Sequence, residues 1–200
     1  MCDPVQQVVY NKKMFPAVFL DRDGVLIENR SNYIREWSQV IIYPKTFSSL
    51  FRLQGAGYKL VIVTNQSAVG RGLVPIQTAE EINHRLVETI RKNNGRVDRV
   101  YMCPHEPGEE CDCRKPKPGM ILQAARELDL DLNRSWMIGD AWSDLLAGQA
   151  AGLRGLILVK TGRGNDQLLE PQPGALYSFH LADDLASAVQ ILLSNHINGD

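Results

Sequence analysis

Two carboxylates stand two positions apart, directly after an apolar run of the sequence. Residues 17–20 are apolar, Asp21 and Asp23 follow, and Gly24 comes next. An apolar run that ends at a glycine is typical of a buried strand that stops at a turn. Two acids this close repel each other unless a cation or a shared proton is present. We interpret the pair as a nucleophile and a proton-transfer group beside a metal, although a lone D-x-D-G turn is more often structural.

A third acid follows a second apolar run. Asp140 comes after residues 135–139, and Asp144 lies four positions further on. Mg²⁺ prefers one or two carboxylates together with water and a substrate phosphate, so we expect Asp140 to complete a magnesium site with Asp21 and Asp23. The alternative for Asp140 is a helix N-cap, and Asp144 can instead bond the local backbone.

Polar and basic groups follow two further apolar runs. Thr64 and Asn65 supply a hydroxyl and an amide, and the backbone after them can donate N–H groups to a phosphate. Lys115 can neutralise a phosphoryl group as a point charge, while Arg114 can fork onto a second anion. The alternative for this basic run is a solvated stretch of charge.

Three cysteines and a histidine cluster in a short loop, and Cys2 stands apart from them. Cys103, His105, Cys111 and Cys113 form a Cys₃His set, a usual tetrahedral complement for zinc. Four protein ligands leave no open position, so this zinc is expected to be structural. The alternatives are buried free thiols or a redox pair. We expect the metal to brace the loop that presents the basic run.

Predicted strands alternate with predicted helices along the chain. This alternation is typical of an α/β fold, a parallel sheet covered by helices on both faces, whose ligands bind beyond the carboxyl ends of the strands. Residues 1–15 are expected to be a poorly fixed lead-in, 25–45 a flap, and 165–180 a loop. The predicted strands are 17–20, 59–64, 97–102, 135–139 and 156–159, and the predicted helices are 46–54, 76–93, 119–128, 140–151 and 181–193.

Composition limits the class of protein. The 200 residues are 44% hydrophobic and 22% charged, which fits a single domain over 1–200 with a sizeable core. A net charge of -1 gives no general attraction to nucleic acid or to anionic membranes. The sequence shows no apolar run of transmembrane length and no secretion signal at its start. We expect a cytoplasmic monomer that binds a small phosphorylated substrate.

Four short motifs together resemble those of the haloacid dehalogenase (HAD) superfamily of phosphatases, in the expected order between 17 and 164. The zinc loop and the short flap resemble the subfamily of D-glycero-D-manno-heptose 1,7-bisphosphate 7-phosphatases, which would link the chain to lipopolysaccharide or S-layer heptose synthesis. Histidinol-phosphate phosphatases share this loop and are the nearest alternative. The motifs are Asp21-x-Asp23-Gly24, Thr64-Asn65-Gln66, Lys115 and Gly139-Asp140-x-x-x-Asp144.

The resemblance implies a three-layer Rossmann-like fold with a minimal cap and a role for each motif. Asp21 would be the nucleophile, and Asp23 the general acid and then the general base. Mg²⁺ would be held by Asp21, the Asp23 carbonyl and Asp140. Thr64 and Lys115 would stabilise the phosphoryl group. The candidate substrate contacts are Asn29, Arg30, Ser31, Asn32, Tyr33, Asn65, Gln66, Ser67, Arg71 and Arg114.

Some questions stay open at the level of sequence. Ala141 stands where these phosphatases commonly place a basic residue, which leaves the sugar phosphate and its anomer undecided. A polynucleotide 3′-phosphatase would need a more basic chain. A non-catalytic zinc-bearing binding module is the alternative of a different class. The complete set of Asp21, Asp23, Lys115 and Asp140 argues against it.

Overall fold

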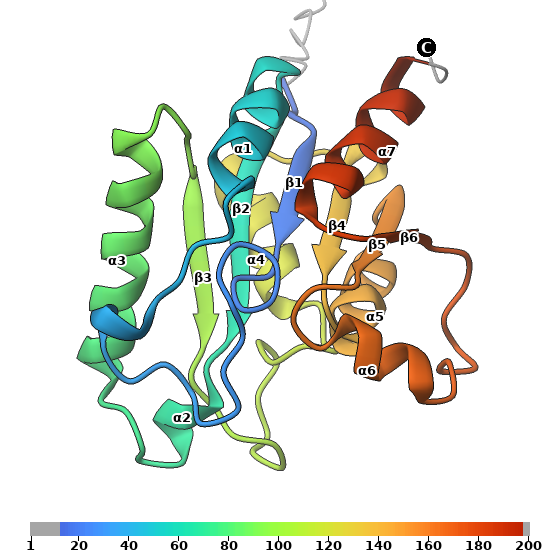
Figure 1. Ribbon diagram of the computed structural model, residues 1–200. Coiled ribbons are helices and arrows are strands. Elements are labelled where there is room, and N and C mark those ends of the chain that lie inside the picture. Colours follow the sequence, from blue (N-terminus) through green and yellow to red (C-terminus); the bar gives the residue numbers. More distant parts are fainter. Residues whose placement is uncertain (1–12, 198–200) are drawn as a thin grey trace, which may run out of the picture.

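The computed structural model describes residues 13–197, so most of the predicted lead-in, residues 1–12, lies outside the described residues. The described chain forms one parallel sheet in the order β3-β2-β1-β4-β5-β6 (Figure 1). The expected α/β architecture is confirmed. The strands are β1 (Ala17–Leu20), β2 (Lys59–Asn65), β3 (Arg99–Cys103), β4 (Trp136–Gly139), β5 (Gly155–Val159) and β6 (His180–Ala182).

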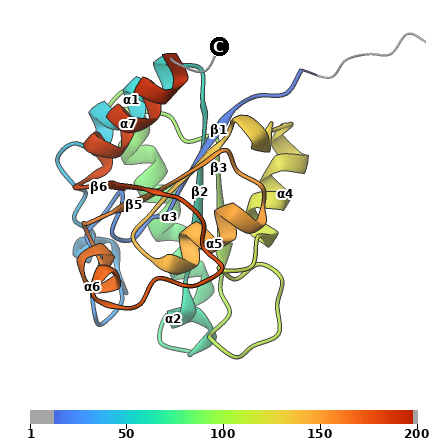
Figure 2. The ribbon, with the colours of Figure 1, turned by 90° about the vertical axis from the view of Figure 1, so that its right-hand side faces the viewer.

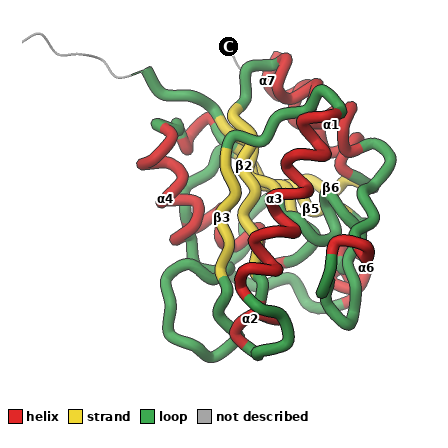
Figure 3. The backbone as a smooth tube through the Cα atoms, turned by 90° about the vertical axis from the view of Figure 1, so that its left-hand side faces the viewer, coloured by secondary structure: helices red, strands yellow, loops and turns green. Residues whose placement is uncertain are grey.

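Helices cover both faces of the sheet, which Figures 2 and 3 show from its two edges. One layer holds α1 (Thr46–Gly55), α3 (Ile76–Lys92) and α7 (Leu185–Ile197), and the other holds α4 (Gly119–Leu128) and α5 (Trp142–Ala150). No helix of the described chain is long and apolar enough to cross a bilayer.

The central strand β1 is apolar at every position because both of its faces are covered. Val18 and Leu20 belong to the core cluster under α1, α3 and α7, and Ala17 and Phe19 belong to the cluster under α4 and α5. All four side chains are fully buried. A continuous apolar run is what a two-sided parallel strand requires.

Some short elements escaped the sequence prediction. The segment 165–180, predicted as a loop, includes most of the short helix α6 (Gly164–Leu169) and the first residue of β6, which pairs with β5. The last helix begins at Leu185, not at 181, because the strand β6 occupies residues 180–182. A single turn, α2 (Ser67–Gly70), also follows β2. These three short elements have neither a continuous apolar run nor a helical period by which they could be recognised.

The flap contains no inserted domain, as expected from its length. Residues 25–45 carry a 3₁₀ turn (Trp37–Gln39), and Ile27 forms isolated bridges with Asp23 and Ile42. The flap runs past the carboxyl ends of the strands, in the lower half of Figure 1, and then rises to the start of α1. The minimal cap implied by the sequence is confirmed.

Candidate active site

Strand register brings three carboxylates together. Leu20 pairs with Ile138 of the neighbouring strand β4, and the Asp21 backbone N–H donates to the Ile138 carbonyl at 3.0 Å. Asp140, two residues beyond Ile138, therefore lies beside Asp21. Asp144, one turn into α5, completes the group, and one oxygen from each acid lies within 4.8 Å of the others.

Gly24 lets Asp140 approach the first strand. Its φ of +86° lies in the region that glycine favours, and a Cβ on Gly24 would overlap the Asp140 carboxylate. Gly162, in the loop after β5, lies close to the same carboxylate, and a Cβ there would collide with it as well. The glycine that ends the D-x-D-G motif is thus a packing requirement of the acid cluster.

Asp140 is not the N-cap of the helix that follows it. The N-cap of α5 is Ala141, whose backbone N–H donates to Asp144 Oδ2 at 3.1 Å. Asp140 instead accepts from the backbone N–H of Arg163 at 2.8 Å and from its guanidinium at 3.1 Å. The capping alternative for Asp140 is excluded, whereas the backbone contact considered for Asp144 is present.

Lys115 is buried within this group of acids. Its ammonium lies 2.6 Å from Asp21 Oδ1 and 2.6 Å from Asp144 Oδ1, and it donates to the Val63 carbonyl at 2.7 Å. Burial opposes its charge, but the Asp144 and Asp21 carboxylates outweigh that effect and raise the pKa of Lys115 above its ordinary value. The solvated alternative for this lysine is excluded.

The acid cluster carries more negative charge than its cations offset. Lys115 and Arg163 face the three carboxylates of Asp21, Asp140 and Asp144. Burial, and then the charges of Asp21 and Asp144, raise the pKa of Asp140 to about 7. Clustered, buried oxygen ligands with one surplus negative charge fit a hard divalent cation such as Mg²⁺.

Asp23 lies apart from the acid cluster and faces the pocket. Its Oδ2 accepts from Gln66 Nε2 at 2.9 Å, and the Arg22 guanidinium contacts both of its oxygens. Gln66 Nε2 also donates to the Thr64 hydroxyl at 2.8 Å. The residues of the second predicted motif therefore connect to the first through side-chain hydrogen bonds.

A hollow of about 340 Å³ opens over these groups, a size typical of small-molecule sites. Most of the predicted site residues line it. The lining residues are Asp21, Arg22, Asp23, Asn29, Arg30, Ser31, Tyr33, Ile34, Asn65, Gln66, Ser67, Arg114, Lys115, Ser143, Asp144 and Arg163.

Four predicted site residues do not line this hollow. Asp140 and Thr64 are buried beneath it. Asn32 lines a second hollow, which is formed by residues of the flap alone. Arg71 is 44% exposed and lies 3.9 Å from Glu106, so the structure does not bring it to the site.

Sequence reasoning gave no site role to several lining residues, and Arg163 is one of them. It follows Thr161 and Gly162 at the end of β5, the same kind of position that drew attention to Asp21 and Asp140. Applying the strand-end rule to the fifth strand would have found it. Arg163 places a cation beside Asp140, where Ala141 has none to offer.

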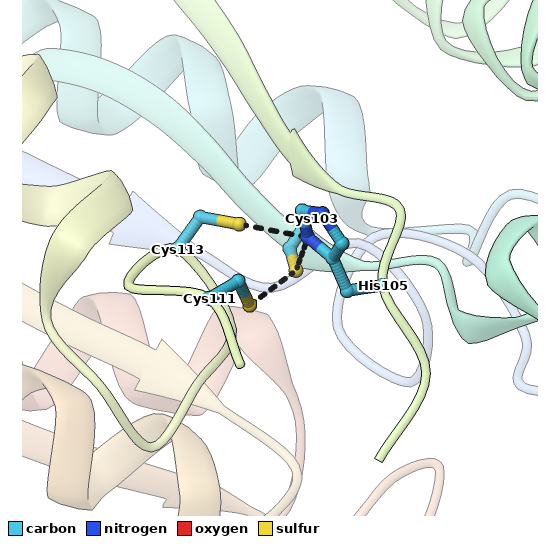
Figure 4. A group of neighbouring side chains, drawn as sticks. All are labelled: Cys103, His105, Cys111 and Cys113. Atoms are coloured by element: carbon cyan, nitrogen blue, oxygen red, sulfur yellow. Dashed lines mark hydrogen bonds between the residues drawn. The ribbon is translucent and has the colours of Figure 1, made fainter. Parts of the chain in front are cut away.

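The predicted zinc ligands meet in one cluster, shown in Figure 4. His105 Nδ1 lies 3.5 Å from the Cys103 sulfur and 3.3 Å from that of Cys113, and the sulfurs of Cys103 and Cys111 are 3.9 Å apart. In a tetrahedral site with Zn–S bonds of about 2.3 Å, two sulfurs lie about 3.8 Å apart. The spacing fits zinc, and the cysteines of this cluster form no disulfide.

The zinc loop is attached to the substrate hollow by Arg114 and Lys115, which follow Cys113 directly. Arg114 Nη1 donates to the His105 carbonyl at 2.9 Å. The side-chain amide of Asn65 both accepts from the Lys115 N–H, at 3.1 Å, and donates to its carbonyl, at 3.0 Å. Asn65 therefore orients the lysine backbone from the end of β2.

Comparison with known proteins agrees with this geometry. A family model described as HAD-hydrolase-like matches residues 112–188. D-glycero-beta-D-manno-heptose-1,7-bisphosphate 7-phosphatase of Pseudomonas aeruginosa is 38% identical over 176 residues, 88% of this chain and 97% of that protein. The enzyme of the same name from Vibrio cholerae is 41% identical over 155 residues, 74% of this chain and 83% of that protein. This chain belongs to the HAD superfamily.

A solved structure shows the same fold with ligands bound. D,D-heptose 1,7-bisphosphate phosphatase from B. bronchiseptica, complexed with magnesium and phosphate, superposes with a TM-score of 0.83 at 34% identity and covers 90% of this chain and 99% of that one. The resemblance to the HAD superfamily and to its heptose bisphosphate phosphatase subfamily, stated from the motifs, is confirmed.

Proposed function

We propose that this chain is a Mg²⁺-dependent phosphomonoesterase that removes the 7-phosphate of D-glycero-β-D-manno-heptose 1,7-bisphosphate through an aspartyl-phosphate. The observation that supports it most is the buried contact between Lys115 and Asp21, next to the acid cluster. The relatives that carry this name support the choice of sugar and of the β anomer.

Asp21 is the nucleophile in this proposal. Its carboxylate attacks phosphorus in line with the departing sugar oxygen, so that an Asp21–phosphate bond forms as the phosphate ester bond breaks. Lys115 fixes the carboxylate through one oxygen and adds positive charge where the phosphoryl group arrives. Both residues are nearly fully buried, which strengthens this interaction.

Asp23 transfers the protons. It protonates the departing sugar oxygen in the first step and removes a proton from the attacking water in the second. Water then adds to phosphorus, releases inorganic phosphate and restores Asp21. Asp23 suits this task because its carboxylate faces the hollow and stands apart from the buried acids.

Asp21, Asp140 and the backbone carbonyl of Asp23 would hold Mg²⁺. When bound, the ion supplies positive charge that offsets the repulsion between an anionic phosphate and a carboxylate nucleophile. Asp144, whose contact with Lys115 was not predicted, holds the lysine ammonium together with Asp21.

The rest of the hollow suits a second anion on the substrate. Arg30 and Arg114 line it, and neither forms an ion pair with a carboxylate among residues 13–197. We assign Arg114 to the phosphate that is not transferred, since a guanidinium can bind phosphate with two N–H groups. Asn29, Ser31 and Tyr33 of the flap are left to contact the sugar hydroxyls.

We also propose that the enzyme acts in the cytoplasm as a monomer on a free sugar phosphate. A cluster of unpaired cysteines is typical of a reducing compartment. The nearly neutral charge supports neither nucleic acid nor anionic lipid as a partner.

The test compares steady-state hydrolysis of both heptose bisphosphate anomers with that of histidinol phosphate and fructose 1,6-bisphosphate, each with and without Mg²⁺. The proposal predicts the highest kcat/KM for the β anomer, with the 1-phosphate left on the product. Asp21→Asn should abolish turnover while the fold and the zinc content persist. A preference for histidinol phosphate would overturn the choice of substrate. If none of these substrates is hydrolysed in the presence of Mg²⁺, the alternative of a non-catalytic zinc-bearing binding module is favoured.

A further inference from the structure

Arg22, the residue between the two motif aspartates, is a fully buried charge. Its side chain is 1% exposed and is among the largest that the core encloses. Burying a guanidinium without partners costs much free energy. The contacts that Arg22 makes therefore indicate its role. The roles proposed above for Asp21 and Asp23 assign no role to Arg22.

The guanidinium forks onto Asp23. Nε donates to Asp23 Oδ2 at 3.1 Å and Nη2 donates to Oδ1 at 3.1 Å, so both carboxylate oxygens are held at once. The contact joins neighbouring residues, which is possible because the chain turns sharply after β1. A two-point contact of this kind fixes the orientation of a carboxylate as well as its position.

Asn83 of α3 holds the other side of the guanidinium. Its Oδ1 accepts from Arg22 Nη1 at 2.7 Å, and its side chain is 7% exposed. Asn83 stands on the buried face of α3 beside apolar residues such as Ile82 and Leu86. Because arginine offers only donors, the oxygen of the Asn83 amide must face it.

Hydrogen bonds link Asn83 to Arg22 and Arg22 to Asp23, and so connect the hollow to a helix that does not line it. No residue of α3 (Ile76–Lys92) contributes to the wall of the substrate hollow. Asp23 itself keeps 20% of its side chain exposed, toward the place where a leaving group departs. A carboxylate that is partly exposed needs such a support to keep one orientation through two proton transfers.

We propose that Arg22, anchored by Asn83, is a positioning residue that holds the Asp23 carboxylate in its proton-transfer orientation. The inference rests on the proposed function and adds α3 to the machinery of that site. It predicts that loss of the Asn83 acceptor impairs both proton transfers, and that capture of the phosphoryl group by Asp21 stays intact only when the leaving group needs no proton.

The test uses the full-length protein and three variants. Asn83→Leu keeps the branched outline of the side chain without an acceptor, Asn83→Asp keeps an acceptor oxygen, and His84→Ala changes the adjacent exposed residue of the same helix. We expect Asn83→Leu to lower kcat on the heptose bisphosphate about ten- to a hundredfold, with KM changed less than about twofold. Asn83→Asp should restore most of kcat, and His84→Ala should match the wild type.

p-Nitrophenyl phosphate separates positioning from a general structural role. Its phenolate leaves without a proton, so Asn83→Leu should form the phosphoenzyme normally but hydrolyse it slowly. Stopped-flow measurement should show a burst of nitrophenol approaching one per enzyme molecule, larger than that of the wild type. A variant that is merely misfolded loses the burst and the steady rate together.

Arg22→Lys repeats the test if Asn83→Leu does not fold, because lysine keeps the charge and loses the fork. Equal kcat in Asn83→Leu and His84→Ala, or a folded Asn83→Leu that shows no nitrophenol burst, would overturn the inference alone. A wild type inactive on the heptose bisphosphate but active on the nitrophenyl ester would overturn only the substrate. A wild type inactive on both would overturn the inference and the proposed function.

Discussion

Asp140 is the residue at which burial and charge conflict most strongly. It has no exposed surface, and its neighbours include two other carboxylates. Arg163 relieves part of the conflict by pairing with it. A divalent cation would relieve the remainder, which ties the stability of this site to metal and to pH.

Metal-dependent stability should follow the protonation of Asp140. Its pKa is raised from 3.8 to about 7 in the metal-free fold, chiefly by burial. Between these two values the folded chain binds the proton and the unfolded chain does not. The free energy of unfolding of the metal-free protein should therefore fall as pH rises through this window. Mg²⁺ should raise Tm more at about pH 8 than at about pH 5.

Differential scanning fluorimetry with and without Mg²⁺ at the two pH values measures this effect. Asp140→Asn is the control, because an amide has no proton to release and is a poor ligand for Mg²⁺. It should show no pH-dependent Tm gain from Mg²⁺. An equal gain in the wild type at both pH values would contradict the account of Asp140.

Arg163 should affect substrate and metal in opposite directions. It lines the hollow and pairs with Asp140, so Arg163→Ala removes a cation that faces both. KM for the bisphosphate should rise about tenfold, as expected for one lost charged hydrogen bond. The Mg²⁺ concentration for half-maximal rate should fall, because Asp140 loses its competing partner.

Steady-state kinetics at varied substrate and varied Mg²⁺ measure the two constants. Arg154→Ala is the matched control, since Arg154 is exposed and precedes β5 at the opposite end of the strand. An unchanged KM in Arg163→Ala would remove Arg163 from the substrate site.

At the scale of elements, the zinc loop is the part whose shape depends least on the core. It connects β3 to α4 without regular structure, and its cysteines lie against residues of the second core cluster. Burial raises the pKa of Cys103 to about 12 in the metal-free form, so this thiol stays protonated unless a metal displaces the proton. Zinc would then replace a hydrophobic core as the support of the loop.

Removing one zinc ligand should misplace Arg114 and Lys115 without unfolding the sheet. We expect Cys113→Ser to lose most of its zinc and to lower kcat/KM at least about tenfold, since these residues follow Cys113 directly. Zinc content by mass spectrometry, circular dichroism and kinetics measure the three quantities. Cys2→Ser is the control. A zinc-free Cys113→Ser with full kcat/KM would show that the loop needs no metal.

Elements with a continuous apolar run or a clear helical period could be predicted from sequence, and elements without either could not. The strands 17–20 and 156–159 and the helix 119–128 are apolar enough, or regular enough, to be recognised. The start of β3 was placed at 97, two residues before Arg99, because Val97 is apolar although it lies outside the ladder. The segment 165–180 has no apolar period, so α6 and β6 depend on contacts that only the folded sheet supplies.

The residues of the candidate site divide in the same way into predictable and unpredictable ones. Asp21, Asp23, Lys115 and Asp140 were predictable because each follows a strand or sits in a dense motif. Arg22 and Asn83 were not, since burying them requires knowing that α3 packs against the turn after β1. Hydrogen bonds between segments that are distant in the sequence produce no recognisable spacing of residues.

At the scale of the whole molecule, the sheet separates two apolar layers. Leu50 of α1 and Leu145 of α5 are fully buried in different clusters on its opposite faces. Whether residues 1–200 act as one domain depends on whether the layers unfold together.

Substitutions in the two layers should add in free energy while unfolding stays cooperative. Leu50→Ala and Leu145→Ala should each lower the free energy of unfolding by about 3 kcal/mol. Their sum should predict the double variant within about 0.5 kcal/mol, because the sites share no partner. Urea titration followed by circular dichroism and by tryptophan fluorescence measures this. Separated transitions for the two probes would contradict a single domain.

The central claim is that Asp21 captures phosphorus while Lys115 and the acid cluster hold it in place. Acid quenching during turnover, followed by borohydride reduction, converts an aspartyl-phosphate to homoserine. Trypsin then releases 14–22, in which Asp21 is the sole carboxylate side chain, and 23–30, which carries Asp23. The account predicts homoserine in the first peptide only, and only with substrate present. No reduction, or reduction in the second peptide, would contradict it.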